Sequence, residues 1–340
     1  KEDQVRLRGV FDESKRRPTL PLNIVRENHI KINWGEYEFP IPPRLGKKVI
    51  VEAPLDEIVK MIDWTFFFTA WDIRGRFPSI LEDEKYGSSA TELYNNAKEL
   101  LDEIVKNKLI EVRAVYGFWP SNSDGDDIIL FNENDDEICR LNMLRQQQDR
   151  GGSSYACLAD FVAQRNSGKD CVGLFAVTGG IGVMELVAKY EGNDDDYNAI
   201  MVRTLGDRLA EASAEWLHSK VRSEWGFPDD DDVSLESLLK EKYRGIRPAF
   251  GYPACPDHSE LRKVFNLLDA ESIGLDLTEN CAITPAASVS GMYLAHPDSK
   301  YFAIGRVDRE QIDDYAKRKG CSVKECEELL YSNLSYVPND

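Results

Sequence analysis

The residues best suited to bind a small molecule lie between Gly245 and Phe302, a range that opens with GIRPAFGYPACPDH. Proline fixes φ and glycine reaches conformations that other residues avoid, so this opening loop has a stiff, defined backbone. A stiff loop loses little conformational entropy when it orders around a ligand. Its one arginine, Arg247, carries a planar fork of donors that suits a carboxylate. The loop therefore predicts a preformed site for a carboxylate-bearing small molecule.

Two carboxylates elsewhere in the chain are candidate partners for a cationic ligand. Asp63 lies in the aromatic segment IDWTFFFTAW, either at the solvated edge of an aromatic core or lining an aromatic-walled pocket. Glu211 lies beside the apolar stripe of a long predicted helix, where a glutamate is usually a rim residue unless the stripe borders a site. Both readings of each carboxylate stay open from these patterns alone. Arg74 and Arg76 add a local basic spot to an acidic chain.

Other chemistries receive little support. None of the four histidines lies in a nucleophile motif such as GxSxG. Cys255 and His258, in CPDH, are spaced like two metal ligands, but no matching CxxC exists, so we expect a packed thiol and a capping histidine. The glycines of TGGIG at 178–182 fit neither GxGxxG nor a GK[ST] loop and favour a tight turn. The aspartates at 229–232 lack the spacing of a calcium loop and indicate a solvated acidic loop.

The composition sets the class of protein. The chain has 340 residues, 42% hydrophobic and 30% charged, with a net charge of −18. This acidity argues against general nucleic-acid binding and against an anionic membrane surface. No apolar run approaches a membrane span, and the charged first residues do not form a signal peptide. Seven scattered cysteines indicate reduced thiols and a cytoplasmic location. Because the chain begins without methionine, we expect it to be a piece of a longer one.

The elements that must position these residues can be read from the apolar spacing. Residues 1–20 have little periodicity and are expected to form a linker or arm, followed by one domain over 21–340. The stretches PLNIVRENHIKINW and EFPIPPRLGKK are expected to be extended because of their prolines. Helical and strand patterns follow in mixed order, which favours an α+β fold. The expected helices begin at 55 and cover 88–106, 198–224, 235–243, about 260–272 and 309–319. The expected strands cover 112–119, 127–131, 172–177 and parts of 281–307.

Four motifs in a fixed order resemble those of the C-terminal activation domain of cobalamin-dependent methionine synthase. They are DWTFFFTAW, GDRLAEA at 206–212, RPAFGYPACPDH, and SVSGMYLAHPDSKYFAIG. The similarity extends from about residue 20, through YAKRKG at 315–320, to NLSY at 333–336. It therefore covers nearly the whole chain, and the ordered set is far more specific than the RxxxGY pattern alone.

The resemblance implies a single C-shaped α+β domain with a bent antiparallel sheet flanked by helices. It also implies binding of S-adenosylmethionine, whose methyl group would be presented to cobalamin held by another domain of the enzyme. The electron for this reductive reactivation would come from flavodoxin or a related reductase. No catalytic residue and no metal ligand is implied. The implied binding residues are Asp63, Glu211, Arg247, Ala249, Gly251, Tyr252, Tyr301 and Phe302.

The chemistry of S-adenosylmethionine agrees with these residue types. Arg247 suits its carboxylate, while Asp63 and Glu211 suit its ammonium or ribose hydroxyls. Tyr252 and Tyr301 offer ring faces to the adenine or the sulfonium. The sulfonium methyl group is already an electrophile, so the protein would contribute proximity and orientation rather than a general base. The chain alone is then expected to bind its ligand without turnover.

Two departures and two alternatives accompany this interpretation. Phe66 and Phe250 stand where bacterial relatives are expected to carry proline, and Phe250 lies inside the binding loop. The corrin-ligating DxHxxG motif is absent from this sequence.

A non-catalytic docking module for the cobalamin domain or flavodoxin is the first alternative function. An independent small-molecule methyltransferase is the second, and it would need an enclosed acceptor site with a base.

Overall fold

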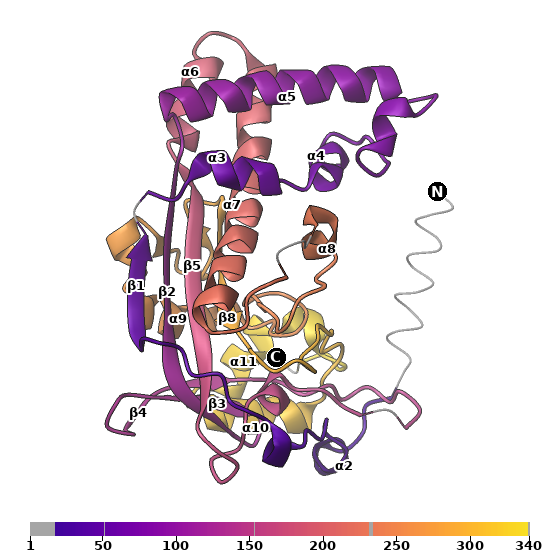
Figure 1. The fold of residues 1–340 in the computed structure, drawn as a ribbon. Helices are drawn as coiled ribbons and strands as arrows, with labels where there is room; N and C mark the ends of the chain where they lie inside the picture. Colours follow the sequence, from indigo (N-terminus) through magenta and orange to yellow (C-terminus); the bar gives the residue numbers. More distant parts are fainter. Residues whose placement is uncertain (1–17, 51, 153, 231–233, 339–340) are drawn as a thin grey trace.

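A computed structural model describes residues 18–50, 52–152, 154–230 and 234–338. Within these ranges helices and strands alternate irregularly along the chain, as Figure 1 shows. The helices are α2 (Leu22–Glu27), α3 (Leu55–Ile58), α4 (Trp64–Ala70), α5 (Gly87–Asn107), α6 (Val183–Glu191), α7 (Asp196–Glu224), α8 (Leu235–Leu239), α9 (Leu261–Leu268), α10 (Arg309–Lys319) and α11 (Val323–Leu329). The strands are β1 (Gly46–Ile50), β2 (Glu111–Asp124), β3 (Asp127–Phe131), β4 (Glu137–Asn142), β5 (Asp170–Ile181), β6 (Asp276–Leu277), β7 (Ile283–Thr284) and β8 (Ser288–Tyr293).

The main sheet is antiparallel and is built on two long strands, β2 and β5. Its order is β4-β3-β2-β5-β8. β1 also pairs with β2, toward the end of β2 that β3 does not reach. β1 pairs with residues 114–118 of β2, whereas β3 pairs with residues 121–124. One edge of β2 is thus shared by two different partners along its length, while β5 follows the other edge almost throughout.

Alternating side chains divide the sheet into two faces with separate cores. Tyr116 and Phe175 point into one core, which α3, α4, α5 and α7 complete. Their neighbours Val115 and Leu174 point into the other, which α9 and the apolar turn at 158–161 complete. This period of two is what a strand buried on both faces must show. α7, about 43 Å long at 1.5 Å per residue, lies along the first face beside β5 and β8.

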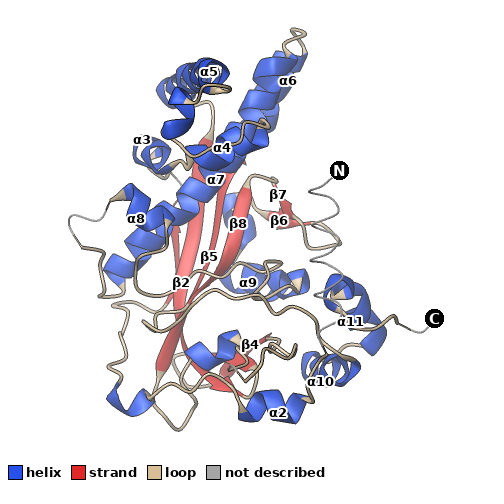
Figure 2. Ribbon diagram, turned by 90° about the vertical axis from the view of Figure 1, so that its right-hand side faces the viewer, coloured by secondary structure: helices blue, strands red, loops and turns tan. Residues whose placement is uncertain are grey.

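Several of the other helices lie at the two ends of the long strands. α5 and α4 project from one end, and α10 and α2 project from the other toward the same side (Figure 1). The perpendicular view separates the group around α5, α6 and α7 from the group around α9, α10 and α11 (Figure 2). The expected α+β fold, a C-shaped domain with an antiparallel sheet flanked by helices, is confirmed.

The end of the sheet near α2 and α10 is held together by a buried ionic network. Arg145 is 3% exposed and pairs with Asp126 and Asp160 at 2.7 Å each. Arg26 of α2 reaches both Asp126 and Asp314 of α10. Because buried charges are costly unless paired, this network fixes α2, the β3 turn and α10 in one arrangement.

The N-terminal segment differs from its prediction. We expected an extended segment, but residues 22–27 form α2, whose Leu22 and Val25 pack on Tyr155. The prediction was wrong because Pro21 precedes the first turn, where proline supports a helix instead of breaking it. Residues 18–20 already contact the domain, since the Leu20 N–H donates to the Gln147 carbonyl at 2.9 Å. Of the linker expected over residues 1–20, residues 1–17 lie outside the described residues, and the boundary at 20/21 stays a prediction.

Two expected helices are shorter than predicted, since the 235–243 helix ends at Leu239 and the 260–272 helix ends at Leu268, with a separate turn at Ala270–Ile273. The 309–319 helix has the expected bounds, and the 88–106 and 198–224 helices differ by one or two residues at their ends. Ile200, expected in the buried stripe of α7, is 51% exposed. Strand structure expected as far as residue 307 ends at Tyr293.

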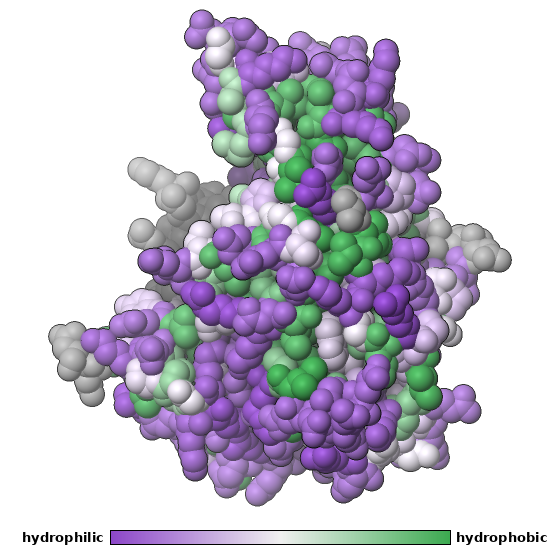
Figure 3. Space-filling view, turned by 90° about the vertical axis from the view of Figure 1, so that its left-hand side faces the viewer, coloured by the Kyte–Doolittle hydropathy of each residue, from purple (hydrophilic) through white to green (hydrophobic). Residues whose placement is uncertain are grey.

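The surface is mostly hydrophilic. Seen from the side of β1, apolar side chains form separated patches among charged and polar ones (Figure 3). None of the helices in the described part of the chain is long and apolar enough to cross a membrane.

Candidate functional site

The loop that follows Gly245 runs along β8, the last strand of the main sheet. Ile246 and Leu294 exchange backbone hydrogen bonds at 3.0 Å, and Ala249 forms an isolated bridge with Gly291. A Cβ on Gly291 would lie 2.3 Å from the Pro248 carbonyl oxygen, so only glycine permits this approach. The loop therefore covers the open edge of the sheet and takes its position from it.

A tight turn follows at residues 249–255. Gly251 has φ +89°, and its N–H donates to the Cys255 carbonyl at 2.8 Å. The Cys255 thiol donates to the Ala249 carbonyl at 3.0 Å. A Cβ on Gly251 would lie 2.1 Å from the His258 ring. The rigidity that the sequence predicted for this loop thus comes from identifiable contacts.

Arg247 is anchored on three sides. Its N–H donates to the Tyr301 hydroxyl at 2.9 Å, and its Nη1 donates to the Tyr243 hydroxyl at 2.8 Å. The same Nη1 lies 2.7 Å from Oε2 of Glu215 on α7. Burial is the largest single effect and opposes the charge of Arg247, but the Glu215 carboxylate and the neighbouring tyrosine hydroxyls together outweigh it and raise the pKa of the guanidinium. The side chain stays 17% exposed, so it is fixed yet within reach of a ligand.

Glu211 and Tyr252 meet at the mouth of the same loop. The Tyr252 hydroxyl lies 3.5 Å from Oε1 of Glu211. The negative charge of Glu211, followed by burial, raises the pKa of Tyr252. Tyr252 is 54% exposed, so most of its ring faces outward. Glu211 therefore borders the loop, and its role as a site residue stays a prediction.

Tyr301 and Phe302 approach the loop from the downstream segment. The Tyr301 hydroxyl accepts the Arg247 N–H, and burial raises its pKa. Phe302 instead packs between the second core and the C-terminal helices, with its ring 6.4 Å from that of Phe161. The side chain of Tyr301 thus faces the site, while Phe302 is a packing residue.

Asp63 caps a helix and has no hydrogen bond or ion pair with the loop among the described residues. It is half-buried and caps α4, where its Oδ1 accepts the Thr65 N–H at 2.8 Å. α4 packs against α7, and Phe66 of α4 lies 5.9 Å from the guanidinium of Arg208. The charge of Arg208 also acts on Tyr252, so α4 and the loop approach the same stretch of α7. The structure joins Glu211, Arg247, Tyr252 and Tyr301 by contacts or shared loop geometry, but it shows no contact of Asp63 with them.

A buried polar layer supports Arg247 from below. The Tyr243 ring lies 4.0 Å from the Arg222 guanidinium, and Arg222 pairs with Asp229 at 2.5 Å. His218 is buried with its ring against those of Tyr243 and Tyr293, and its pKa is well below its ordinary value because of burial and the nearby arginines. Asp229, expected in a solvated loop, is thus a structural counter-ion. Asp230 is the only other described residue of that run, and Asp231 and Asp232 lie outside the described residues.

Sequence reasoning missed Glu215 and Tyr243. Their only signal in the sequence is spacing, since Glu215 lies four residues after Glu211 and Tyr243 lies four residues before Arg247. In α7 that spacing places the two glutamates on one helix face. Spacing alone does not mark a buried charge as functional, because its role depends on a partner distant in the sequence.

The remaining candidates have structural roles. Gly179 and Gly180 continue β5, so the expected turn begins only at Gly182, which precedes α6 with φ +89°. Cys255 is a packed thiol, but the cap at the start of the 258–260 turn is Asp257, not His258. Within the described residues no three histidine, cysteine or acidic side chains are grouped to hold a metal.

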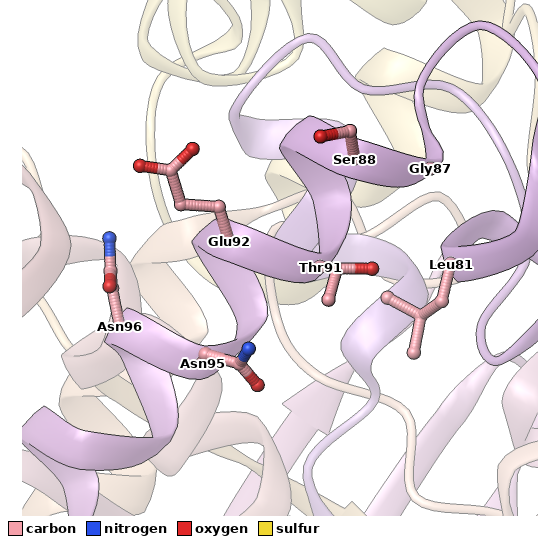
Figure 4. A pocket seen from close by; sticks show the side chains of 7 residues that line it. All are labelled: Leu81, Gly87, Ser88, Thr91, Glu92, Asn95 and Asn96. Carbon is pink, nitrogen blue, oxygen red and sulfur yellow. The ribbon is translucent and has the colours of Figure 1, made fainter.

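The two phenylalanines that replace the expected prolines differ in exposure. Phe250 is 4% exposed and packs in the second core, whereas Phe66 is 61% exposed on α4. A shallow hollow lies at the start of α5 and includes none of the predicted site residues in its lining (Figure 4). Its lining, drawn in that figure, comprises Leu81, Gly87, Ser88, Thr91, Glu92, Asn95 and Asn96.

Comparisons with known proteins give a consistent result. A sequence profile described as "Vitamin B12 dependent methionine synthase, activation domain" matches residues 54–320. A solved structure described as "Crystal Structure of the MetH Reactivation Domain bound to AdoHcy" is 45% identical in sequence, with a TM-score of 0.91. The alignment covers 94% of this chain and 100% of that one.

Proposed function

Because this chain belongs to the family of vitamin B12-dependent methionine synthase activation domains, we propose that it binds S-adenosylmethionine at the loop of Arg247. It is accordingly a domain of a cobalamin-dependent methyltransferase, and the cobalamin is carried by another domain of the enzyme. In this proposal the bound nucleoside presents its methyl group for reductive methylation of that cofactor. The observation that carries it is the anchored constellation of Arg247, Tyr301, Glu211 and Tyr252.

The residues present fit the ligand group by group. Arg247 offers a guanidinium, already fixed in place, to the carboxylate of the amino-acid part. Glu211 and Asp63 offer negative charge to the ammonium or the ribose hydroxyls. The exposed ring of Tyr252 suits adenine or sulfonium. The peptide groups of Ala249 and Gly251 line the same turn, and Phe302 would contribute through its backbone because its side chain is packed away.

In this proposal the residues of the chain bind the ligand and orient its methyl group. A sulfonium methyl group is electrophilic without further activation, so the ligand itself supplies the reactive methyl group. Arg247 and its anchors would fix the amino-acid end, leaving the methyl group directed outward. Such positioning lowers a barrier by removing translational and rotational freedom. No side chain of the site needs to move a proton, and the chain alone is expected to bind without turnover.

The proposal extends to partners and surroundings. The cobalamin-binding domain of the same enzyme is the partner that must reach the methyl group. Flavodoxin or a related reductase would deliver the electron, and the exposed Arg74 and Arg76 are the proposed contact for an acidic donor. We also propose a cytoplasmic location and no role in nucleic-acid or membrane binding, on the strength of the −18 net charge and the free cysteines.

Isothermal titration calorimetry tests this function. The wild-type chain should bind S-adenosylmethionine, and Arg247→Ala should weaken binding by about tenfold or more, since a charge-assisted pair contributes roughly 1.5–3 kcal/mol. Arg113→Ala is a suitable control, because Arg113 pairs only with Glu111 on β2 in the described contacts. If the wild type bound the cobalamin domain or the reductase but no nucleoside, the docking-module alternative would replace this proposal. Methyl transfer without added cobalamin would support the independent methyltransferase.

A further inference from the structure

We propose that Glu215 is a positioning residue that presents Arg247 to the ligand carboxylate and thereby sets the preference for carboxylate-bearing nucleosides. This inference rests on the proposed function, because it assigns a cause to one part of the same binding site. Glu215 is 3% exposed on the inner face of α7. It is therefore placed to act on Arg247 and not on the ligand directly.

The contacts of Arg247 leave a particular edge of its guanidinium for the ligand. The ion pair with Glu215 and the hydrogen bond to Tyr243 both use Nη1. An arginine has five N–H donors, and its Nε and Nη2 groups form a parallel pair that matches the two oxygens of a carboxylate. With Nη1 occupied, Nε and Nη2 are the natural bidentate edge. Glu215 and Tyr243 thus decide which side of the guanidinium meets the ligand.

The supporting groups are themselves fixed. Glu215 projects from a 29-residue helix, and Tyr243 packs against Arg222, which is paired with Asp229. Fixing a long side chain before binding lowers the entropy that association must otherwise lose. The advantage should be confined to ligands that use this guanidinium.

Charge balance points to the same role. Arg247 and Arg222 lie near the same buried histidine, so two cations share this layer. Glu215 supplies the counter-charge for one and Asp229 for the other. The second carboxylate oxygen of Glu215, Oε1, is buried and accepts no hydrogen bond from the described residues. A carboxylate held in this way depends on Arg247 for its compensation, and removing its charge frees Arg247 to turn toward solvent.

A pair of ligands that differ only in the carboxylate tests the proposal. Calorimetry would compare S-adenosylmethionine with decarboxylated S-adenosylmethionine, which keeps the ammonium, the sulfonium and the adenosine. The wild type should prefer the carboxylated ligand by about tenfold or more. Glu215→Gln should lose most of this preference, by weakening S-adenosylmethionine binding while leaving the decarboxylated ligand within about twofold. A general loss of structure would weaken both ligands alike.

Matched variants keep the test decisive. Glu224→Gln is the control, because Glu224 lies on the same helix and also contacts a cation, Lys48, and a tyrosine hydroxyl, that of Tyr116. It should leave both affinities unchanged. Tyr243→Phe removes only the second anchor of Nη1 and should reduce the preference several-fold even if Glu215→Gln fails to fold.

The outcomes distinguish failure of the proposed function from failure of the positioning role of Glu215. A wild type that binds neither ligand overturns the proposed function. A wild type with a clear preference that both Glu215→Gln and Tyr243→Phe retain overturns the positioning role alone. Loss of the preference in both variants, with Glu224→Gln unchanged, supports it.

A second inference has an independent basis in the C-terminal helices. The sulfur atoms of Cys321 and Cys326 lie 3.0 Å apart, where α10 ends and α11 begins. Cys326 is fully buried and Cys321 is half-buried. Five positions separate the two cysteines in the sequence. We infer that they form a reversible disulfide with a small-molecule disulfide such as oxidised glutathione as the oxidant.

The exchange balances in two steps. The Cys321 thiolate, as the accessible group, attacks oxidised glutathione, forms a mixed disulfide and releases one glutathione thiol. The Cys326 thiolate then attacks the Cys321 sulfur, forms the protein disulfide and releases the second glutathione. Two protein thiols are oxidised and one glutathione disulfide is reduced. The product would join the end of α10 to the first turn of α11.

Mass spectrometry after incubation with oxidised glutathione tests this assignment. The wild type should lose two hydrogens and give a peptide linked through Cys321 and Cys326. Cys326→Ser should retain one glutathione on Cys321, and Cys321→Ser should leave Cys326 unmodified. Cys139, half-buried and without a neighbouring thiol in the described residues, is the internal control. A wild type that keeps glutathione on Cys321, or that stays reduced while Cys139 reacts, would overturn the inference.

Discussion

At the scale of single residues, Arg247 shows how a binding group depends on its surroundings. A free arginine on a loop would be a flexible cation, but here three contacts fix its backbone and its guanidinium. Tyr301 anchors the backbone, while Tyr243 and Glu215 hold one nitrogen of the side chain. The site is therefore organised before a ligand arrives, so that little conformational entropy is lost on binding.

Gly251 provides a residue-scale prediction. Gly251→Ala should lower the free energy of unfolding by about 1–3 kcal/mol and weaken S-adenosylmethionine binding, because of its positive φ and the clash with His258. Gly226→Ala is the matched control, since Gly226 has a similar φ of +94° but nothing within 4 Å of an added Cβ. Urea unfolding and calorimetry on both variants would measure this. If the two lost affinity equally, the shape of the 249–255 turn would not matter to the ligand.

The sequence was informative at this scale only where a residue belonged to a motif. Arg247, Tyr252 and Tyr301 could be selected because RxxxGY and SKYF are recognisable patterns. Glu215 could not, since its importance comes from a partner 32 residues away. Asp63 was selected, but the structure shows it as a helix cap without contact to the loop, so its role in binding stays a prediction.

At the scale of elements, α7 is the support of the site. One face of it carries the apolar residues that pack on the sheet, and the same face carries Glu215, His218 and Arg222 at helical spacing. Its bounds were predictable because a stripe of this length is unmistakable in the sequence. The polar residues within it were not, because buried charges are specified by tertiary partners.

The end of α7 gives a prediction about the acidic run. Asp229→Asn should destabilise the fold by about 2–4 kcal/mol, since it breaks a pair with the buried Arg222 guanidinium. Asp230→Asn should change the stability by less than about 0.5 kcal/mol, as a substitution away from such a feature does. Chemical denaturation of the two variants would compare neighbouring residues of equal charge. Equal effects would mean that Asp229 belongs to a solvated loop after all.

The start of β5 gives a pH prediction. Burial raises the pKa of Asp170 to about 6, although it accepts hydrogen bonds from the Ala163 and Cys171 N–H groups. The folded state then holds this proton more tightly than the unfolded state, so the stabilisation is complete below about pH 4 and is lost as the pH rises through about 6.

The measurement is the unfolding free energy of the wild type minus that of Asp170→Asn across this range. The difference should fall by on the order of 2 kcal/mol between pH 4 and pH 6.5. A difference that stayed constant would show that Asp170 titrates normally in the folded state.

At the scale of the whole molecule, the long antiparallel sheet separates two helical groups while the ligand loop lies along its β8 edge. The α+β class and the C-shaped domain could be predicted from mixed patterns and from the ordered motifs. α2 could not, because six residues carry too weak a periodicity and its place depends on Arg26 pairing with distant carboxylates. Short elements fixed by tertiary ion pairs are the part of this fold that sequence patterns leave out.

The charge distribution over the molecule gives a prediction about the electron donor. Arg74→Glu with Arg76→Glu should slow reductive activation in the full-length enzyme, because an acidic reductase would lose its attractive contact on a chain of net charge −18. The effect should shrink as salt is added. Lys47→Glu with Lys169→Glu, an equal charge change at other exposed positions, is the control. Equal rates for both double variants would remove Arg74 and Arg76 from the account.

The central claim is that the loop of Arg247, α7 and Tyr301 form one S-adenosylmethionine site. A crystal structure of this chain with bound S-adenosylhomocysteine tests it most directly. We expect the ligand carboxylate to lie within hydrogen-bond distance of Arg247, on the edge opposite Glu215, with the sulfur atom facing outward. A ligand bound in another place, such as the hollow on α5, or with its carboxylate turned away from Arg247, would contradict the account.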